Sequence, residues 1–237
     1  WAVIPGVMKA YLNVNEVISS IMMNYIGMYL VNYSVSLVLF DALRNQSLPV
    51  ATTAVIPKMG FDKIFTGSPA NGGFVIAILF VILIYIILNK TSFGYEMKAC
   101  GFNKDASKYA GINEKRNIIL SMVIAGALAG VGGGLLYLSG SGKFIEVVDV
   151  LPAEGFNGIP VALLGLSNPI GVLFAGLFIA YLNVGGNAMQ QFGFIPQIVD
   201  IIISCIIYCS ALSLMIKVWL SKRRKTKELG TAKKEGE

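Results

Sequence analysis

The chain has 237 residues, of which 55% are hydrophobic and only 14% are charged. Ordinary soluble domains carry about 25% charged residues, so this composition indicates an integral membrane protein. The sequence contains no histidine, which removes the commonest general base and the commonest metal ligand. It also shows no carboxylate pair and no nucleophile–base arrangement, so we expect no catalytic residue, no metal site and no cofactor.

The apolar runs of the sequence have lengths that suit membrane crossings. About 20 residues of helix span the hydrocarbon layer, at a rise of about 1.5 Å per residue. Runs of this kind predict five spans, at about residues 17–40, 73–89, 117–138, 169–184 and 196–216.

Charged residues indicate which loops lie on which side of the membrane. The loop at 90–116 carries six Lys and Arg and the tail at 217–237 carries eight, whereas 139–158 carries one Lys and three acidic residues. The positive-inside rule therefore predicts that loop 90–116 and the tail are cytoplasmic and that 139–158 lies outside. This uneven basic excess is typical of cytoplasmic loops and not of a nucleic-acid surface.

Five spans alone contradict this arrangement. From the cytoplasmic loop at 90–116, the three remaining spans would leave the basic tail outside the membrane. One more crossing is needed, and the only candidate is the stretch at 155–166, which is about 18 Å long as a helix and too short to span alone. Broken helices of this kind line wet cavities and are typical of transporters. We therefore predict an all-α polytopic membrane protein with about five transmembrane helices plus one short or broken helix.

Four polar residues are candidates for a substrate pathway. Glu16, Ser20 and Asn24 share one face at the start of the first span, and Asn157 lies in the short helix. Polar side chains inside a membrane face protein or a cavity and not lipid. The alternative interpretation is helix capping and hydrogen bonding between helices.

Two glycine-rich stretches indicate packing and flexibility, not phosphate binding. Gly126, Gly130 and Gly134 recur every four residues, a pattern that lets helix backbones approach closely. The stretch YLSGSGKF at 137–144 has the Gly-Lys pair of a phosphate loop, but Tyr137 and Phe144 occupy its first glycine and its hydroxyl positions. We therefore expect the chain to bind no ATP itself.

The loop at 90–116 is too long for a plain turn. Asn103 can cap a helix that begins at Lys104, and Gly111 can end it in the left-handed conformation. Three apolar side chains would then share one face: Ala106, Tyr109 and Ala110. Because so short a helix is marginal alone in water, we expect this face to dock into a partner's groove. The alternative is that the helix packs back on its own bundle.

The same loop resembles the coupling loop of permease subunits of ABC importers in the ribose, branched-chain amino acid and nucleoside class. That loop has the pattern G…A-x-G-x-N-x-x-A-A-x-x-x-G-I. Seven residues match it: Gly94, Ala99, Gly101, Asn103, Ala106, Gly111 and Ile112. Ser107 departs from the pattern, since a second alanine is usual there. The matching residues, together with Tyr109, are the predicted ATPase-coupling residues.

Two further stretches support the resemblance, which covers nearly all of residues 1–216. LPAEGFNGIPVALLGLSNPIGVLFAGL at 151–177 is similar to the class pattern G-x-x-x-I-A-V-A-L-L-G-x-x-x-P-x-G, with Pro160 in place of the more usual alanine. LNVNEVISSIMMNYIGMYL at 12–30 resembles the N-E-V-I-x-x-I-M-x-N-Y-I segment of the bacterial nucleoside permeases.

The resemblance implies a multi-pass subunit of the bacterial plasma membrane, with a cytoplasmic C-terminus. Residues 1–216 would form a permease domain without its N-terminal helices, followed by the basic tail at 217–237. Its implied partners are an ATPase dimer that hydrolyses the ATP, a second permease subunit, a substrate-binding lipoprotein and the lipid bilayer, and no nucleic acid.

The implied function is to form the substrate pathway for nucleosides and to couple it to the separate ATPase. One alternative is a permease of the same class for a simple sugar or a branched-chain amino acid. Another is an ion-coupled secondary transporter, which would need a charged residue in mid-span. The predicted spans carry none there.

Overall fold

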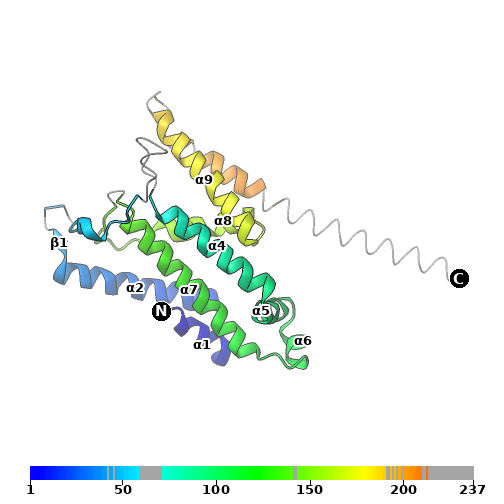
Figure 1. The fold of residues 1–237 in the computed structure, drawn as a ribbon. Coiled ribbons are helices and arrows are strands. Elements are labelled where there is room, and N and C mark those ends of the chain that lie inside the picture. The colour runs from blue at the N-terminus through cyan, green and yellow to red at the C-terminus, as the bar shows by residue number, and fades with distance from the viewer. Residues whose placement is uncertain are drawn as a thin grey trace, which may run out of the picture. The chain divides into compact units, whose positions relative to one another are not determined.

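The structure, a computed structural model, describes residues 1–41, 43–44, 46–58, 71–140, 143–190, 193, 195, 197–198, 200–209 and 212. The chain divides into two compact units, Trp1–Leu151 and Pro152–Glu237, and each is described by itself. Among the described residues, four helices are long and apolar enough to cross a membrane (Figure 1): α2 (Glu16–Val38), α4 (Gly73–Lys90), α7 (Glu114–Leu138) and α9 (Pro169–Met189). The prediction of an all-α polytopic membrane protein is confirmed.

The first four predicted spans coincide with these helices, apart from shifts of a few residues at their ends. The fifth, at 196–216, is described only in part, where a short apolar helix covers Asp200–Cys209. The end of that span and the tail at 217–237 lie outside the described residues.

The first unit contains a helix that the sequence analysis did not predict. This helix, α1 (Val3–Leu12), packs along α7 and turns into α2. Its buried residues are small, namely Pro5, Gly6 and Ala10. A Cβ atom added at Gly6 would lie 3.3 Å from the Cβ of Met122, so the missing side chain lets the two helices approach closely. With only ten residues, α1 was too short to be recognised as a span.

The predicted glycine face of α7 is confirmed at one of its three positions. Gly126 faces Ala2 so closely that no side chain would fit between them. At Gly130 and Gly134, an added Cβ would meet none of the described residues within 4 Å. Close packing between α1 and α7 therefore accounts for the first glycine of the repeat.

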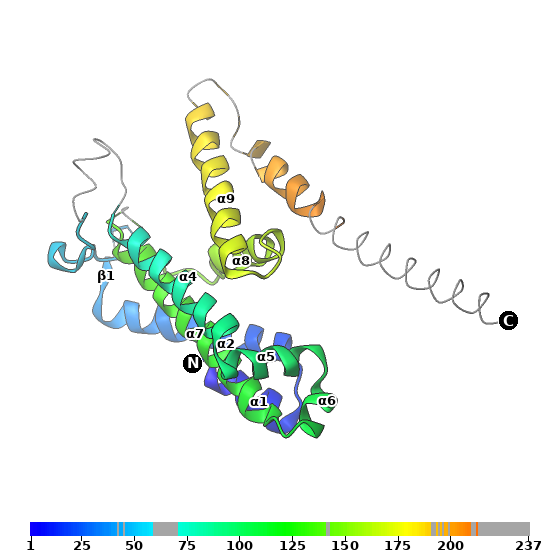
Figure 2. The same ribbon diagram turned by 45° about the vertical axis from the view of Figure 1, so that its right-hand side comes forward.

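One end of the first unit is held together by loops. Two short strands, β1 (Phe40–Asp41) and β2 (Gln46–Ser47), form an antiparallel hairpin after α2. The Ser47 amide donates to the Ile145 carbonyl at 2.8 Å, and the Asn71 side chain donates to the Ser139 carbonyl at 2.8 Å. The end of α2, the start of α4 and the end of α7 therefore meet here (Figure 2).

The opposite end of α4 and α7 carries the loop predicted to be cytoplasmic. This loop contains two further helices, α5 (Ser92–Phe102) and α6 (Lys104–Tyr109). Both ribbon views show them beyond the ends of α4 and α7, away from the strands (Figures 1 and 2). The hairpin and the α5–α6 loop are thus separated by the length of the spanning helices.

The second unit begins with the short helix that the charge pattern required. This helix, α8 (Ala153–Leu164), has 12 residues and contains Pro160. It turns back sharply into α9, where an added Cβ at Gly165 would lie 2.5 Å from the Val172 nitrogen. The short helix is therefore confirmed, whereas its crossing of the membrane remains a prediction.

Candidate functional site

The chain reverses between α4 and α5 because two residues suit the turn. The Thr91 hydroxyl donates to the Ile87 carbonyl at 2.6 Å and accepts from the Gly94 amide at 3.1 Å, so it caps the start of α5. Gly94 is buried against the backbone of Ile87 and Leu88, where a side chain would have no room. Gly94 therefore serves the geometry of the loop and does not lie on its outer surface.

The boundaries of α6 agree with those predicted from the sequence. The Asn103 side chain accepts a hydrogen bond from the Ala106 amide at 3.0 Å and caps the helix. Gly111 has a φ of +78°, and its amide donates to the Lys108 carbonyl at 3.0 Å while the Ile112 amide donates to the Ser107 carbonyl at 3.1 Å. These two bonds form a Schellman motif, which needs a left-handed residue at this position.

The predicted apolar face of α6 points away from the unit. Ala106, Tyr109 and Ala110 are all exposed, and the side chain of Tyr109 is 94% exposed. The helix rests on its own bundle through its other side, where Ser107 is only 4% exposed. Packing back on the bundle therefore does not cover the apolar face.

A groove of about 480 Å³ runs between α5 and α6 beside this face. It is lined by Ser92, Tyr95, Glu96, Ala99, Phe102, Asn103, Ala106, Ser107, Ala110 and Ile112. Four of the predicted coupling residues thus meet in one depression: Ala99, Asn103, Ala106 and Ile112. Gly101, Tyr109 and Gly111 lie on exposed surface outside the lining.

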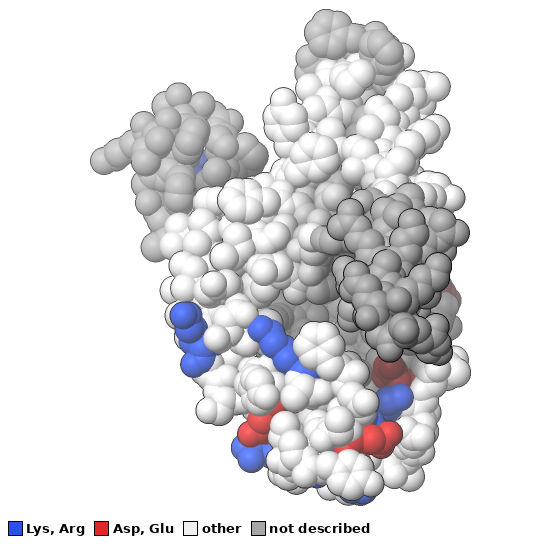
Figure 3. Space-filling view, turned by 90° about the vertical axis from the view of Figure 1, so that its right-hand side faces the viewer, with Lys and Arg blue, Asp and Glu red and all other residues white. Residues whose placement is uncertain are grey.

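The groove lies at the charged end of the first unit. On the face in Figure 3, Lys, Arg, Asp and Glu side chains gather at one end, and the surface above them is free of charge over a wide area. The charged end includes an ion pair between Lys104 and Glu114 at 4.0 Å, and a contact of Lys98 with the Asn89 side chain at 2.6 Å. This distribution is the one expected where a membrane span ends in water.

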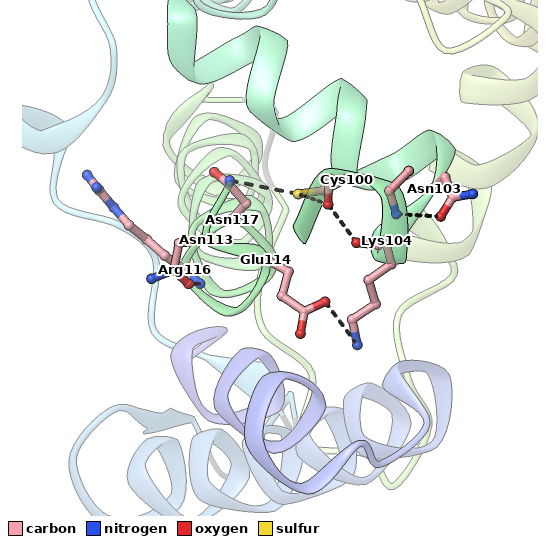
Figure 4. A network of polar contacts seen from close by, with 9 residues as sticks. Cys100, Asn103, Lys104, Asn113, Glu114, Arg116 and Asn117 are labelled. Atoms are coloured by element: carbon pink, nitrogen blue, oxygen red, sulfur yellow. Dashed lines mark hydrogen bonds and ion pairs between the residues drawn. The ribbon is translucent and has the colours of Figure 1, made fainter. Parts of the chain in front are cut away.

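Beneath the groove lies a set of polar contacts that the sequence analysis missed. The side chain of Asn117, in α7, is only 2% exposed and donates to a Glu96 carboxylate oxygen at 3.1 Å. It also lies 3.9 Å from the Cys100 sulfur, and this sulfur lies 3.3 Å from the Ser107 hydroxyl (Figure 4). In the sequence, Ser107 stood out only as a departure from the coupling-loop pattern.

The predicted pathway residues have less distinctive surroundings. Glu16 is exposed at the start of α2 and pairs with Lys9 of α1 at 2.7 Å. Ser20 is half-buried and Asn24 is exposed, both further along α2. Asn157 is exposed on α8, in the second unit. The Lys9 contact favours a role for Glu16 at the α1–α2 turn, and the pathway assignment remains a prediction for all four residues.

Comparison with known proteins identifies the family of the chain. The family model described as the permease component of a branched-chain amino acid transport system matches residues 1–211. The nucleoside ABC transporter permease protein NupB of Lactococcus lactis is 38% identical over 99% of the chain and 65% of its own length. The guanosine ABC transporter permease protein NupP of Bacillus subtilis is 36% identical over 95% of the chain and 64% of its own length.

A third relative has a different named substrate. The glucose ABC transporter permease protein TsgB13 of Haloferax volcanii is 30% identical over 87% of the chain and 56% of its own length. The chain thus spans less than two thirds of the length of each of these relatives. No solved structure matches it significantly. Because the family model matches most of the chain, the protein belongs to the family of permease components of branched-chain amino acid transport systems.

Proposed function

We propose that the chain is part of the transmembrane subunit of an ABC importer and that its α5–α6 loop docks on a separate ATPase. The observation that carries this proposal is the exposed apolar face of α6, which is capped at both ends and borders a groove. An isolated helix of six residues has little stability of its own. In the proposed contact, the apolar face of α6 would dock into a groove of the ATPase.

Nucleosides are the proposed substrates. Two relatives that match nearly the whole chain are named as permeases for nucleosides and for guanosine. The glucose permease among the relatives supports a simple sugar as the second candidate, at lower identity and lower coverage. The exposed polar residues Glu16, Asn24 and Asn157 are the proposed contributors to the pathway, together with the half-buried Ser20.

The remaining features of the proposal follow from the family and the charge pattern. The importer would lie in a bacterial plasma membrane, with the basic loop at 90–116 and the C-terminus in the cytoplasm. A second permease subunit would complete the pathway, and a substrate-binding lipoprotein would deliver the nucleoside from outside. The ATPase would hydrolyse the ATP, so this chain would need no cofactor.

The test is uptake of radiolabelled guanosine by cells that carry the full-length gene with its neighbours. Ala106→Asp places a charge in the groove, and we expect it to abolish ATP-driven uptake while the protein still reaches the membrane. Lys108→Ala is the matched control, because Lys108 is exposed on the same helix but outside the groove lining. We expect it to leave uptake unchanged.

Each outcome bears on a different part of the proposal. Uptake that survives Ala106→Asp would contradict docking through α6. Uptake of glucose but not of guanosine by the unmodified importer would replace nucleosides by a sugar. Uptake that follows an ion gradient and needs no ATP would contradict the importer class as a whole.

A further inference from the structure

The place where α5, α6 and α7 meet is polar, although a membrane protein has ample apolar residues to fill it. The buried residue of α6 is Ser107, and the buried residue of α7 is Asn117. On α5, the half-buried side chains of Glu96 and Cys100 contact them. Hydrogen-bonding groups therefore form part of the contact between these three helices.

These groups form a continuous chain across the three helices, and Figure 4 shows the link between Asn117 of α7 and Cys100 of α5. The Asn117 amide group of α7 donates to Glu96 and approaches the Cys100 sulfur, both on α5. The Cys100 thiol donates to the Ser107 hydroxyl on α6 at 3.3 Å, and this hydroxyl donates to the Lys104 carbonyl at 2.7 Å. We call the four side chains Glu96, Asn117, Cys100 and Ser107 the polar joint.

The polar joint is not arranged for stability alone. The Asn117 carbonyl oxygen is buried and accepts no hydrogen bond from the described residues. An unpaired buried acceptor is costly, and an apolar residue of similar size would avoid that cost. Directional bonds, on the other hand, fix one relative position of three helices more strictly than apolar packing does.

The joint also reaches the surface that the proposed partner would use. Glu96 and Ser107 belong to the joint and line the groove between α5 and α6. A partner seated in this groove would contact two members of the joint directly. From there the contacts continue to Asn117, the fourth residue of α7, which is a predicted span.

We propose that the polar joint makes α5, α6 and the start of α7 move as one rigid piece. Movement of α6 is then transmitted to the spanning helix α7. This inference rests on the proposed function, in which a partner ATPase moves α6. Asn117 and Ser107 are positioning residues in it, since neither touches substrate or ATP.

The first experiment measures how many nucleosides are imported per ATP hydrolysed by the full importer in liposomes. We expect Asn117→Leu and Ser107→Ala to lower this ratio at least about fivefold, the lower end of typical coupling between sites, while ATP hydrolysis continues. Asn113→Ala is the matched control. It removes the cap of α7, where the Asn113 side chain accepts from the Arg116 amide at 3.2 Å, and leaves the joint intact.

The control separates transmission from stability. Loss of the cap destabilises α7 in general, so we expect it to lower the amount of folded importer but not the ratio of transport to hydrolysis. If Asn113→Ala lowers the ratio as much as Asn117→Leu, or if Asn117→Leu leaves it unchanged, the joint does not transmit movement. If the unmodified importer shows no ATP-driven uptake, the proposed function fails, and that result is visible before any variant is tested.

The second experiment locks the joint covalently. Ser107→Cys places a second thiol beside Cys100, where the sulfur and the present hydroxyl lie 3.3 Å apart. Cys205 and Cys209 are replaced by alanine so that neither can pair with Cys100 or with the new thiol. We expect the oxidised variant to form the Cys100 disulfide and to import with the normal ratio, because a rigid link replaces a rigid contact. Transport that stops on oxidation and returns on reduction would show that α6 must move against α5, and would overturn the proposal.

Discussion

At the scale of single residues, the loop at 90–116 is defined by local hydrogen bonds. Asn103 and Gly111 were recognisable in the sequence because a cap and a left-handed stop depend on only a few neighbouring residues. The role of Ser107 was not recognisable. Its burial depends on Cys100 and Asn117, which lie seven and ten residues away and on other helices.

The turn after α8 gives a prediction at the same scale. Leu166 has a φ of +53°, and its amide donates to the Leu163 carbonyl in a Schellman motif that usually holds glycine. The left-handed conformation costs a residue with a side chain about 1–2 kcal/mol, and glycine avoids this cost. Glycine also has more freedom in the unfolded chain, which offsets part of the gain in stability. We therefore expect Leu166→Gly to stabilise the protein by about 0.5–1 kcal/mol, seen as a higher midpoint of thermal unfolding in detergent.

The neighbouring residue offers the control for this substitution. Gly165→Ala would force a Cβ atom against Val172 and Gly171, so it should lower the midpoint. If Leu166→Gly lowers the midpoint as well, the apolar contacts of Leu166 outweigh the strain of its backbone.

At the scale of elements, close helix packing depends on where glycine faces a neighbour. An added side chain at Gly126 would collide with Ala2 of the segment that leads into α1, whereas Gly130 faces open space among the described residues. We expect Gly126→Val to destabilise the isolated chain by about 1–3 kcal/mol, the usual cost of overpacking. Gly130→Val has the same helix propensity cost and serves as the control.

Thermal unfolding of the two purified variants in detergent tests this difference. If both variants lose the same small amount of stability, the loss reflects helix propensity alone. In that case the contact between α1 and α7 would not be the reason for glycine at position 126.

The elements themselves were predictable in proportion to their length. Four spans were found from their apolar runs because the hydrocarbon thickness imposes about 20 residues. The short helix α8 was found by counting crossings against charges. The helix α1 was missed because a mostly apolar stretch of ten residues does not distinguish a packed helix from a loop, and only its contact with α7 reveals it.

At the scale of the whole molecule, the two ends of the first unit should lie on opposite sides of the membrane. Leu43, beside the hairpin, is 97% exposed, and Tyr109, on α6, is 94% exposed. In a background without native cysteines, we expect Leu43→Cys to react with a membrane-impermeant maleimide in intact cells. Tyr109→Cys should react only after the membrane is permeabilised, because the positive-inside rule predicts that the basic loop is cytoplasmic.

The reverse labelling pattern would contradict the orientation inferred from the charges. Labelling of both positions in intact cells would mean that α4 and α7 do not separate the two loops across a membrane.

The class of the protein, the positions of four spans and the boundaries of α6 could be read from the sequence alone. These features depend on composition, on runs of apolar residues and on caps that act within a few residues. Three features became visible only in the folded chain: the exposed face of α6, the packed glycine of α7, and the buried contacts that link Ser107 and Asn117 through Cys100. Such contacts join separate helices, and a local pattern carries no information about which helices become neighbours.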